Sequence, residues 1–460
     1  MEQIKENKMG TMPIPKLLFS VSIPIIISML VQALYNVIDS VFVAQYNNDA
    51  GTGALTVAFP IQNLLIALAV GLAVGTSALL SRYLGQKRPD KANVVAGQGF
   101  FLMGCGYLVF LLFGLFLVKG YVGLQVTLDP LRAEYANDYI TIISVGSLGV
   151  FIQVICERLL QSTGKSVYSM ITQGAGAVVN IILDPIMIFG YLGCPEMGVK
   201  GAAIATVVGQ FVSAGLGLFF NLKYNPEIKI LLKNFIPKAS VIKEILEIGV
   251  PSVLMQAIGS VMTFSMNIIL EGFSGTAVNV FGVYFKLQSF VFMPIFGFNN
   301  GLIPIMAYNY GAGNKKRVFA ALRLGLIVAI GYMLLGLMAF QLIPGVLLGF
   351  FNASSEMLEI GIPALRTISL SFIFAGFSVI SISACQALGK SIYSLFVSIG
   401  RQLVVLIPAA FLLSLIGEVR YVWWAFPIAE IMSLALCLIF LIRVLKKAFG
   451  ESKEAVPSDD

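Results

Sequence analysis

Apolar runs long enough to cross a bilayer recur along nearly the whole chain, and they constrain its fold more than any other feature. A helix needs about 20 mostly apolar residues to cross the hydrocarbon core. Of the 460 residues, 58% are hydrophobic and only 12% are charged. The sequence therefore predicts an all-α polytopic membrane protein with no separate soluble domain. Twelve spans are expected, at 17–43, 54–80, 92–118, 135–157, 166–190, 198–220, 244–270, 277–307, 318–345, 359–385, 391–416 and 421–445.

Positive charge alternates from loop to loop. Lysine and arginine gather before the first span, in every second loop, and after the last span, as with Lys87, Arg88, Lys315 and Lys316. Because cytoplasmic loops carry an excess of these residues, we expect both termini to be cytoplasmic. The N-terminus is polar and lacks the pattern of a removable signal peptide. The plasma membrane is the expected location.

The composition excludes several kinds of function. The net charge of +7 lies in short loops, so it indicates topology and no nucleic-acid partner. The chain has no histidine and no CxxC pair among its five cysteines, so neither a disulfide framework nor a cysteine metal site is expected. No cofactor is expected, and any proton chemistry must involve carboxylates.

The sequence contains an internal repeat. Phe59, Gln62, Gly71, Gly75 and Gly85 return as Phe285, Gln288, Gly297, Gly301 and Gly311, each 226 residues later. QSTGKSVYS at 161–169 returns as QALGKSIYS at 386–394, and Pro24 corresponds to Pro251. An even number of spans separates the copies, so two homologous six-helix bundles of parallel topology are predicted, related by a pseudo-two-fold axis along the membrane normal.

The repeat also predicts the domain boundaries. An N-terminal six-helix lobe is expected at 1–222 and a C-terminal six-helix lobe at 244–446. A basic cytoplasmic linker at 223–243 joins them, and a polar cytoplasmic tail follows at 447–460.

The fifth span contains an acid, and an ionisable residue is energetically unfavourable within a membrane. Asn180 and Asp184 lie four residues apart, on one helical face, and Pro185 follows. Pro185 cannot donate to the carbonyl of Ile181, which leaves that oxygen free for a cation or water. Since an ionisable residue at membrane depth usually has a functional role, Asp184 is a candidate site residue.

The first and sixth spans add polar candidates. A polar stripe in the first span contains Gln32, Tyr35, Asn36 and Asp39, and the sixth span contributes Thr206. A carboxyl group buried there needs a partner, a cation or a proton. Two carboxylates in one pocket repel each other, so one stays protonated unless a cation lies between them. The residues permit either a proton or sodium.

The second half keeps the scaffold without these acids. Shifted by 225–227 residues, Asp184 corresponds to Ala409, and Asp39 falls near Ser265 and Met266. This asymmetry indicates a coupling site confined to the first half.

Other charged residues are expected in ordinary roles: Glu157 pairs with Arg158, while Arg366, Arg401 and Glu430 anchor helix ends at the interface. For Lys286, snorkelling to the interface and facing a central cavity remain equally open.

With these features in hand, the chain resembles the multidrug and toxic compound extrusion (MATE) family. The resemblance covers all twelve spans and rests on the repeat and on SIPIIISMLVQALYNVIDSVFVA, LGQKRPDKA, QSTGKS, NIILDP and GAAIAT. It implies a V-shaped pair of bundles that extrudes lipophilic cations in exchange for sodium ions or protons. It also implies that Asp39, Asn180, Asp184 and Thr206 match the family's first-half cation or proton site, with Tyr35 and Asn36 nearby.

The expected function is a secondary active multidrug antiporter, not an enzyme. The coupling proton, or a sodium ion, is expected at Asp39, Asn180, Asp184 and Thr206, while Gln32, Tyr35, Asn36, Gln256 and Lys286 line the drug cavity. The expected partners are lipophilic cationic drugs and membrane lipids, and the protein is expected to be a monomer. The main alternative is a flippase for a lipid-linked oligosaccharide or another amphiphile. An intramembrane prenyltransferase is less compatible, because its metal needs clustered acids and the two acids here are single residues on separate spans.

Overall fold

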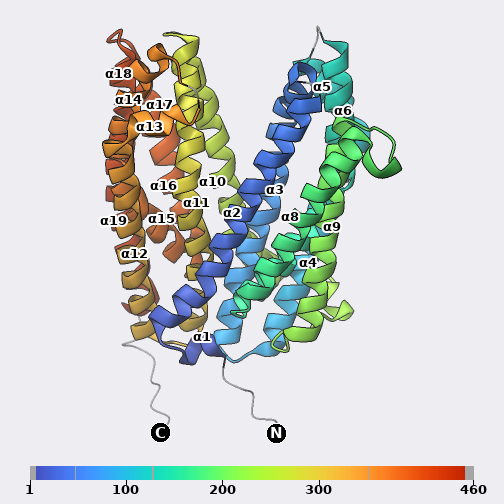
Figure 1. Ribbon diagram of the computed structural model, residues 1–460. Coiled ribbons are helices and arrows are strands. Elements are labelled where there is room, and N and C mark those ends of the chain that lie inside the picture. The colour runs from blue at the N-terminus through green and yellow to red at the C-terminus, as the bar shows by residue number, and fades with distance from the viewer. Residues whose placement is uncertain (1–6, 47, 127–128, 352, 451–460) are drawn as a thin grey trace, which may run out of the picture.

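The computed structural model of the chain describes residues 7–46, 48–126, 129–351 and 353–450, and these ranges are almost entirely helical (Figure 1). The first half contains α1 (Lys8–Thr11), α2 (Ile14–Tyr46), α3 (Asn48–Gly85), α4 (Pro89–Leu112), the π-helical turn η1 (Phe113–Leu117), α5 (Val118–Gln125), α6 (Pro130–Val145), α7 (Leu148–Ser162), α8 (Ser166–Phe189), the 3₁₀ turn η2 (Tyr191–Gly193), α9 (Val199–Tyr224) and the 3₁₀ turn η3 (Leu232–Phe235).

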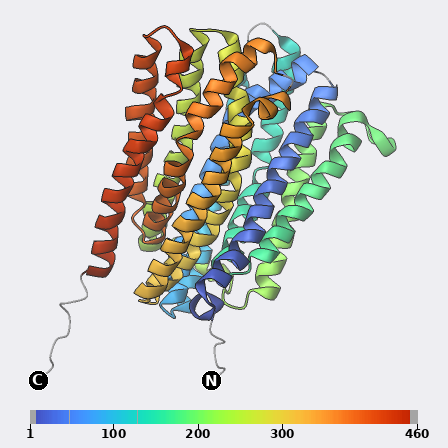
Figure 2. The same ribbon diagram turned by 60° about the vertical axis from the view of Figure 1, so that its left-hand side comes forward.

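The second half follows the same plan. It contains α10 (Ala239–Glu271), α11 (Gly275–Gly311), α12 (Lys315–Leu342), α13 (Pro344–Gly349), α14 (Ser355–Ser369), α15 (Phe372–Ala387), α16 (Ser391–Ile399), the π-helical turn η4 (Gly400–Leu406), α17 (Ile407–Ser414), α18 (Val419–Val422) and α19 (Ala425–Gly450). Figures 1 and 2 place α1 and the C-terminal end of α19 at the same end of the molecule, called here the α1 end.

The described residues form ten helices long and apolar enough to cross a membrane, or twelve spans if each of two bent pairs counts as one. The bent pairs are α6 with α7, at 46°, and α14 with α15, at 47°. The breaks, at Gly146–Ser147 and Leu370–Ser371, lie about 225 residues apart, so they occupy equivalent places in the repeat. The predicted fold class is therefore confirmed, although the sequence pattern did not indicate the bends.

The helices form two groups that diverge away from the α1 end (Figure 1). Helices α3–α9 make up one group, α10–α19 make up the other, and α2 runs from one to the other. The start of α2, including Leu17 and Ile25, packs in the core of the second half, whereas Val43 near its end packs in the core of the first half. Helix α2 is thus shared between the two groups.

The repeated glycines lie where the two halves touch. A Cβ atom added to Gly85 on α3 would lie 1.9 Å from the carbonyl oxygen of Tyr308 on α11. A Cβ atom added to Gly311 on α11 would lie 2.0 Å from the carbonyl oxygen of Arg82 on α3. Both distances are far below van der Waals contact, so only glycine lets these backbones meet at the α1 end.

A second pair of repeated glycines extends this contact along the helices. A Cβ atom on Gly75 of α3 would lie 2.4 Å from the carbonyl oxygen of Ile245 on α10. A Cβ atom on Gly301 of α11 would lie 2.4 Å from the hydroxyl of Ser22 on α2. The second long helix of each half therefore packs closely against the first long helix of the other half, as a two-fold relation requires.

The short helix α1 joins both halves at this end. The side chains of Asn309 and Arg317, on α11 and α12, donate hydrogen bonds to the carbonyl oxygen of Met9, at 3.1 and 3.0 Å. The Asn7 amide, which also caps α1, donates to the carboxylate of Glu227 in the segment after α9. The Met9 side chain is fully buried. These contacts hold α1 as a clasp across the closed end.

The segment that connects the halves is fixed to α4 by side chains of that helix, and Gln98 makes most of the hydrogen bonds. The amide nitrogen of Gln98 donates to the carbonyl oxygens of Asn234 and Ile236, at 2.6 and 2.8 Å. The amide oxygen of Gln98 accepts from the backbone N–H of Lys238, at 2.8 Å. Gln98 is fully buried, so these three bonds satisfy polar groups of the connecting segment that would otherwise lack partners.

Candidate functional site

Two buried carboxyl groups lie on neighbouring helices, α2 and α8. Asp39 lies on α2 and is 8% exposed, and Asp184 lies on α8 and is fully buried. The two carboxyl groups are close enough to interact electrostatically. Helix α2 packs along α8, and this packing brings together two acids that lie 145 residues apart in the sequence.

Asn180 links the fifth and sixth expected spans at this site. Its amide nitrogen donates to Oδ1 of Asp184 at 3.2 Å and to the hydroxyl of Thr206 on α9 at 3.5 Å. The first bond follows from the i, i+4 spacing on α8, and the second from the close packing of α8 on α9. That packing depends on Gly176 and Gly209, because a Cβ atom at either one would lie 2.7 Å from the carbonyl oxygen of the other.

Three oxygen atoms of the site are buried and lack a hydrogen-bond partner among the described residues: Oδ1 of Asp39, Oδ1 of Asn180 and Oδ2 of Asp184. Buried polar atoms are nearly always satisfied, so such a group needs a partner from beyond the described residues, such as a bound ion or a proton. All three atoms are acceptors. They therefore suit a hard cation with oxygen ligands, or protons on the carboxyl groups.

The structure describes part of the polar stripe of α2. Tyr35 is half-buried and interacts electrostatically with both Asp39 and Asp184, and the half-buried Gln32 hydrogen-bonds to Tyr35. The side chain of Asn36, another predicted site residue, lies outside the described part of the structure.

The site also contains residues that the sequence analysis did not single out. Tyr139 on α6 is buried, receives a hydrogen bond from the amide of Gln62 at 3.0 Å and interacts electrostatically with Asp39. Gln62 is one of the repeated residues, which was the only sequence signal for this pair. The sequence did not indicate a site role for Tyr139, because a single tyrosine in a span is usually a packing residue.

Glu157 is a third acid near the site, and it interacts electrostatically with Arg158, although the two side chains form no ion pair among the described residues. The Glu157 carboxylate accepts from the amide of Gln153 at 3.0 Å and interacts electrostatically with Tyr35. Arg158 instead donates to the amide oxygen of Gln161 at 3.2 Å. Successive helical residues point about 100° apart, so the neighbours face different partners. Gln153, one turn before Glu157, was the available signal.

The two cavity residues predicted in the second half make no direct polar contact with the acids among the described residues. Gln256 on α10 is exposed, and Lys286 on α11 places its ammonium 5.8 Å from the centre of the Phe351 ring. Among the described residues, neither forms a hydrogen bond or an ion pair with Asp39 or Asp184. The structure thus brings together Gln32, Tyr35, Asp39, Asn180, Asp184 and Thr206, without Gln256 and Lys286.

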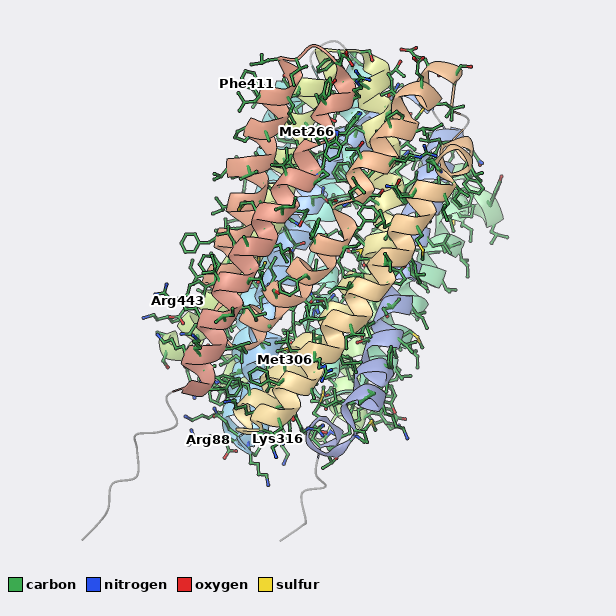
Figure 3. All side chains as sticks on the ribbon, turned by 90° about the vertical axis from the view of Figure 1, so that its left-hand side faces the viewer. Arg88, Met266, Met306, Lys316, Phe411 and Arg443 are labelled. Atoms are coloured by element: carbon green, nitrogen blue, oxygen red, sulfur yellow. The ribbon has the colours of Figure 1, made fainter. Side chains whose placement is uncertain are left out.

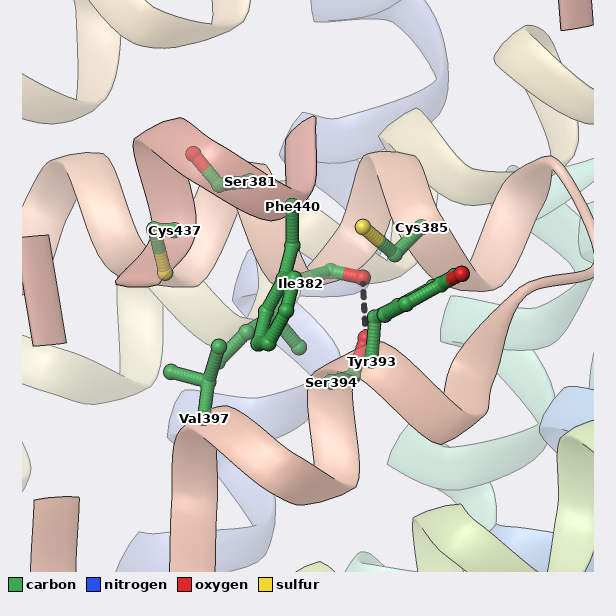
Figure 4. Close-up of a pocket in the computed structure, with 8 residues that line it drawn as sticks. All are labelled: Ser381, Ile382, Cys385, Tyr393, Ser394, Val397, Cys437 and Phe440. Carbon is green, nitrogen blue, oxygen red and sulfur yellow. Dashed lines mark hydrogen bonds between the residues drawn. The ribbon is translucent and has the colours of Figure 1, made fainter. Parts of the chain in front are cut away.

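The equivalent helices of the second half hold a different arrangement. Arg401 on η4 and Glu430 on α19 form an ion pair at 2.8 Å, and Glu430 is 9% exposed, so these residues pair with each other and do not serve as separate interface anchors. A nearby crevice between α15, α16 and α19 is lined by Cys385, Tyr393 and Cys437 and leaves no room for a water molecule (Figure 4). Glu430 therefore pairs with a cation of the chain, whereas neither Asp39 nor Asp184 forms an ion pair among the described residues.

The fold and site together define a class of protein. A bundle of spans in two repeats, closed at one end and with buried carboxyl oxygens in one half that lack a partner among the described residues, has the architecture of a secondary transporter. No group of three or more metal-ligating side chains of the His, Cys, Asp and Glu types occurs in the described ranges.

Comparison with known proteins gives the family. The MatE family model matches residues 24–186 and 251–412. The chain belongs to the MatE family, whose members are transporters and not enzymes. The two matched segments correspond to the two copies of the repeat.

The similar proteins cover almost the full chain. The multidrug export protein MepA of Staphylococcus haemolyticus is 25% identical over 446 residues, which span 93% of this chain and 94% of that protein. The solved structure of the MATE multidrug transporter DinF-BH is 33% identical, with a TM-score of 0.84, over 96% of this chain and 98% of that one. A crystal structure of MATE in complex with MaL6 is 25% identical, with a TM-score of 0.89, over 96% and 99% of the two chains.

Proposed function

We propose that this transporter is a secondary active multidrug antiporter, which extrudes lipophilic cationic compounds in exchange for protons or sodium ions. The coupling site consists of Asp39, Asn180, Asp184 and Thr206. The observation that carries the proposal is the set of three buried acceptor oxygens on Asp39, Asn180 and Asp184 that lack a partner within the described chain. The multidrug export relatives support the substrate class.

The chemistry of the site explains how an ion can change the conformation. Two ionised carboxylates in one buried pocket repel each other, and this repulsion favours separation of α2 from α8. A sodium ion between them, or a proton on one of them, removes the repulsion and allows the two helices to pack closely. An ion can shift the conformational equilibrium only by its differential affinity for the two states, and the distance between Asp39 and Asp184 supplies that difference.

Helix α2 transmits this change to the rest of the molecule. Its end carries Asp39, and its start packs in the core of the second half beside the glycine contact of Ser22 and Gly301. A change in the packing of α2 on α8 therefore changes the contact between the halves. In this scheme the halves move as units, 1–222 and 244–446, joined by 223–243 and followed by the tail 447–460.

The proposed orientation places the α1 end in the cytoplasm and the protein in the plasma membrane. Arg88 and Lys316 lie at the α1 end (Figure 3), and an excess of basic residues is typical of cytoplasmic loops. The closed α1 end then makes this an outward-facing state, from which a drug leaves as an ion enters. The proposed transport unit is a monomer with no cofactor, because all residues of the coupling site come from one chain.

Transport in proteoliposomes tests the proposal. A proton gradient or a sodium gradient is imposed in turn, and efflux of a cationic dye is followed. We expect at least one gradient to drive efflux, and Asp184→Asn to abolish it. Asp138→Asn is the matched control, because Asp138 is an acid of the same half that pairs with Lys200 at 3.0 Å and not with a residue of the proposed coupling site. Full transport by Asp184→Asn, or no transport under either gradient, would contradict the proposal.

A further inference from the structure

A groove lies between the α1 ends of α12 and α19, on the outer face of the second half. It is a cavity of about 280 Å³ lined by Lys315, Phe319, Ile442, Leu445, Lys446 and Phe449. A water molecule occupies roughly 30 Å³, so the groove can hold a group several times that size. It is separate from the carboxylate site, which lies in the first half.

The polar groups of the groove carry one sign of charge. Lys315 begins α12, and Lys446 lies near the end of α19, so the two lysines stand on opposite walls. In the described part of the chain, no carboxylate lies within ion-pair distance of either ammonium. Helix α12 contains no acid, and the one described acid of α19, Glu430, lies four turns away and pairs with Arg401. The groove therefore has two positive charges and no counter-ion among the described residues.

Aromatic rings hold one of these charges in place. The Lys315 ammonium lies 5.9 Å from the centre of the Phe319 ring and 5.8 Å from that of the Phe449 ring. Phe449 packs edge-on against Tyr310, with ring centres 5.7 Å apart, so it is itself fixed. A positioned ammonium loses less freedom on binding an anion than a free lysine does.

The position of the groove determines what kind of anion fits. It lies at the ends of two helices that span the membrane, and beside it Phe319 and Ile442 are 39% and 51% exposed. Figure 3 shows this face, with Lys316 at its lower edge and Arg443 higher up on its left-hand side. A ligand with a phosphate at the charged mouth and apolar chains running along the helices satisfies both features.

We propose that this groove binds an anionic phospholipid, with the headgroup phosphate between Lys315 and Lys446 and the acyl chains beside α12 and α19. The leaflet follows from the proposed orientation, which makes it the cytoplasmic one. Bound there, the lipid bridges the end of the chain's last span to the start of α12, and α12 adjoins the clasp through Arg317.

Native mass spectrometry of the full-length protein tests the site, by titration with dioleoyl phosphatidylglycerol and, separately, with dioleoyl phosphatidylcholine. We expect the first bound phosphatidylglycerol to bind at least about tenfold more tightly than phosphatidylcholine. The double variant Lys315→Gln/Lys446→Gln is expected to lose this preference. The matched control is Lys316→Gln/Lys447→Gln, which removes the same charge from the same helices one residue further on, outside the groove, and is expected to change binding less than twofold.

Four results would overturn the proposal: no preference for the anionic lipid, equal losses in the two double variants, displacement of the lipid by 1 mM glycerol 3-phosphate, and binding that appears only after deletion of residues 451–460. The second indicates diffuse charge attraction, the third a soluble phosphate site, and the fourth that the acidic tail of the chain occupies the groove. None of these binding measurements depends on transport, so the lipid proposal can fail while the antiporter proposal stands.

Discussion

Replacing a glycine at the crossing of α3 and α11 should open the α1 end. In Gly85→Ala, the new Cβ atom meets the carbonyl oxygen of Tyr308 at 1.9 Å, whereas real Cβ contacts are essentially never shorter than 3.0 Å. The two backbones must therefore separate locally by at least 1.1 Å, the difference between these distances. Overpacking of this kind typically costs about 1–3 kcal/mol.

That cost falls only on the state in which the two halves touch. If the α1 ends are apart in the other state, the ratio of the two states shifts by about 5- to 150-fold toward it, since each 1.4 kcal/mol is a factor of ten. Gly311→Ala should act in the same way, because its Cβ atom meets the carbonyl oxygen of Arg82 at 2.0 Å.

Pulsed EPR distances across the α1 end measure this shift. Spin labels at Lys87 and Lys316, introduced in a cysteine-free background, report the separation of the halves. The matched control is Gly104→Ala on α4, where a Cβ atom meets nothing within 4 Å. We expect a longer distance population in Gly85→Ala and none in the control. The same distances in both variants would refute the reasoning.

Two further predictions concern the segments that cross between the halves. Burial raises the pKa of the Glu227 carboxyl above its ordinary value of 4.5. The carboxyl therefore holds its proton more tightly when the clasp is docked than when the segment is free. As a result, the docked clasp loses stability as the pH rises from 4.5 through the raised pKa. Hydrogen exchange of Lys8–Thr11, corrected for the intrinsic rate, should therefore be slower at pH 5 than at pH 8, and Glu227→Gln should remove most of that difference; an unchanged difference in this variant would contradict the assignment. Gln98→Ala leaves buried polar groups of the connecting segment without a partner, which typically costs about 1–3 kcal/mol. The thermal unfolding midpoint of this variant should therefore be lower than that of the wild type. Gln125→Ala, at an exposed position, is the control and should leave the midpoint unchanged.

The sequence predicted the spans and the repeat well because both depend on local patterns. Apolar length identifies a span without knowledge of its neighbours, and the glycines at 71, 75 and 85 align with those at 297, 301 and 311 by counting alone. Their role could not be predicted, because it depends on which helix lies opposite. Only the structure shows that Gly85 and Gly311 are the places where the two halves meet.

The sequence predicted those site residues that share one helical face, or that are ionisable residues in an apolar span, where burial is energetically unfavourable. Asp184 and Asn180 are one turn apart on α8, and their hydrogen bond follows from that spacing. Tyr139 and Glu157 were missed because they approach Asp39 and Tyr35 only through the packing of separate helices. The adjacent charges of Glu157 and Arg158 do interact electrostatically, but helical geometry directs their hydrogen bonds to different partners.

The most direct test of the central claim is release of the coupling ion when a drug binds to the purified protein. A cationic dye is added to the transporter in detergent, and protons are followed with a pH electrode or sodium with an ion-selective electrode. We predict that the wild type releases one of these ions as the dye binds, and that Asp39→Asn and Asp184→Asn bind the dye with little or no release. Undiminished release from both variants would contradict the assignment of coupling to these two carboxyl groups.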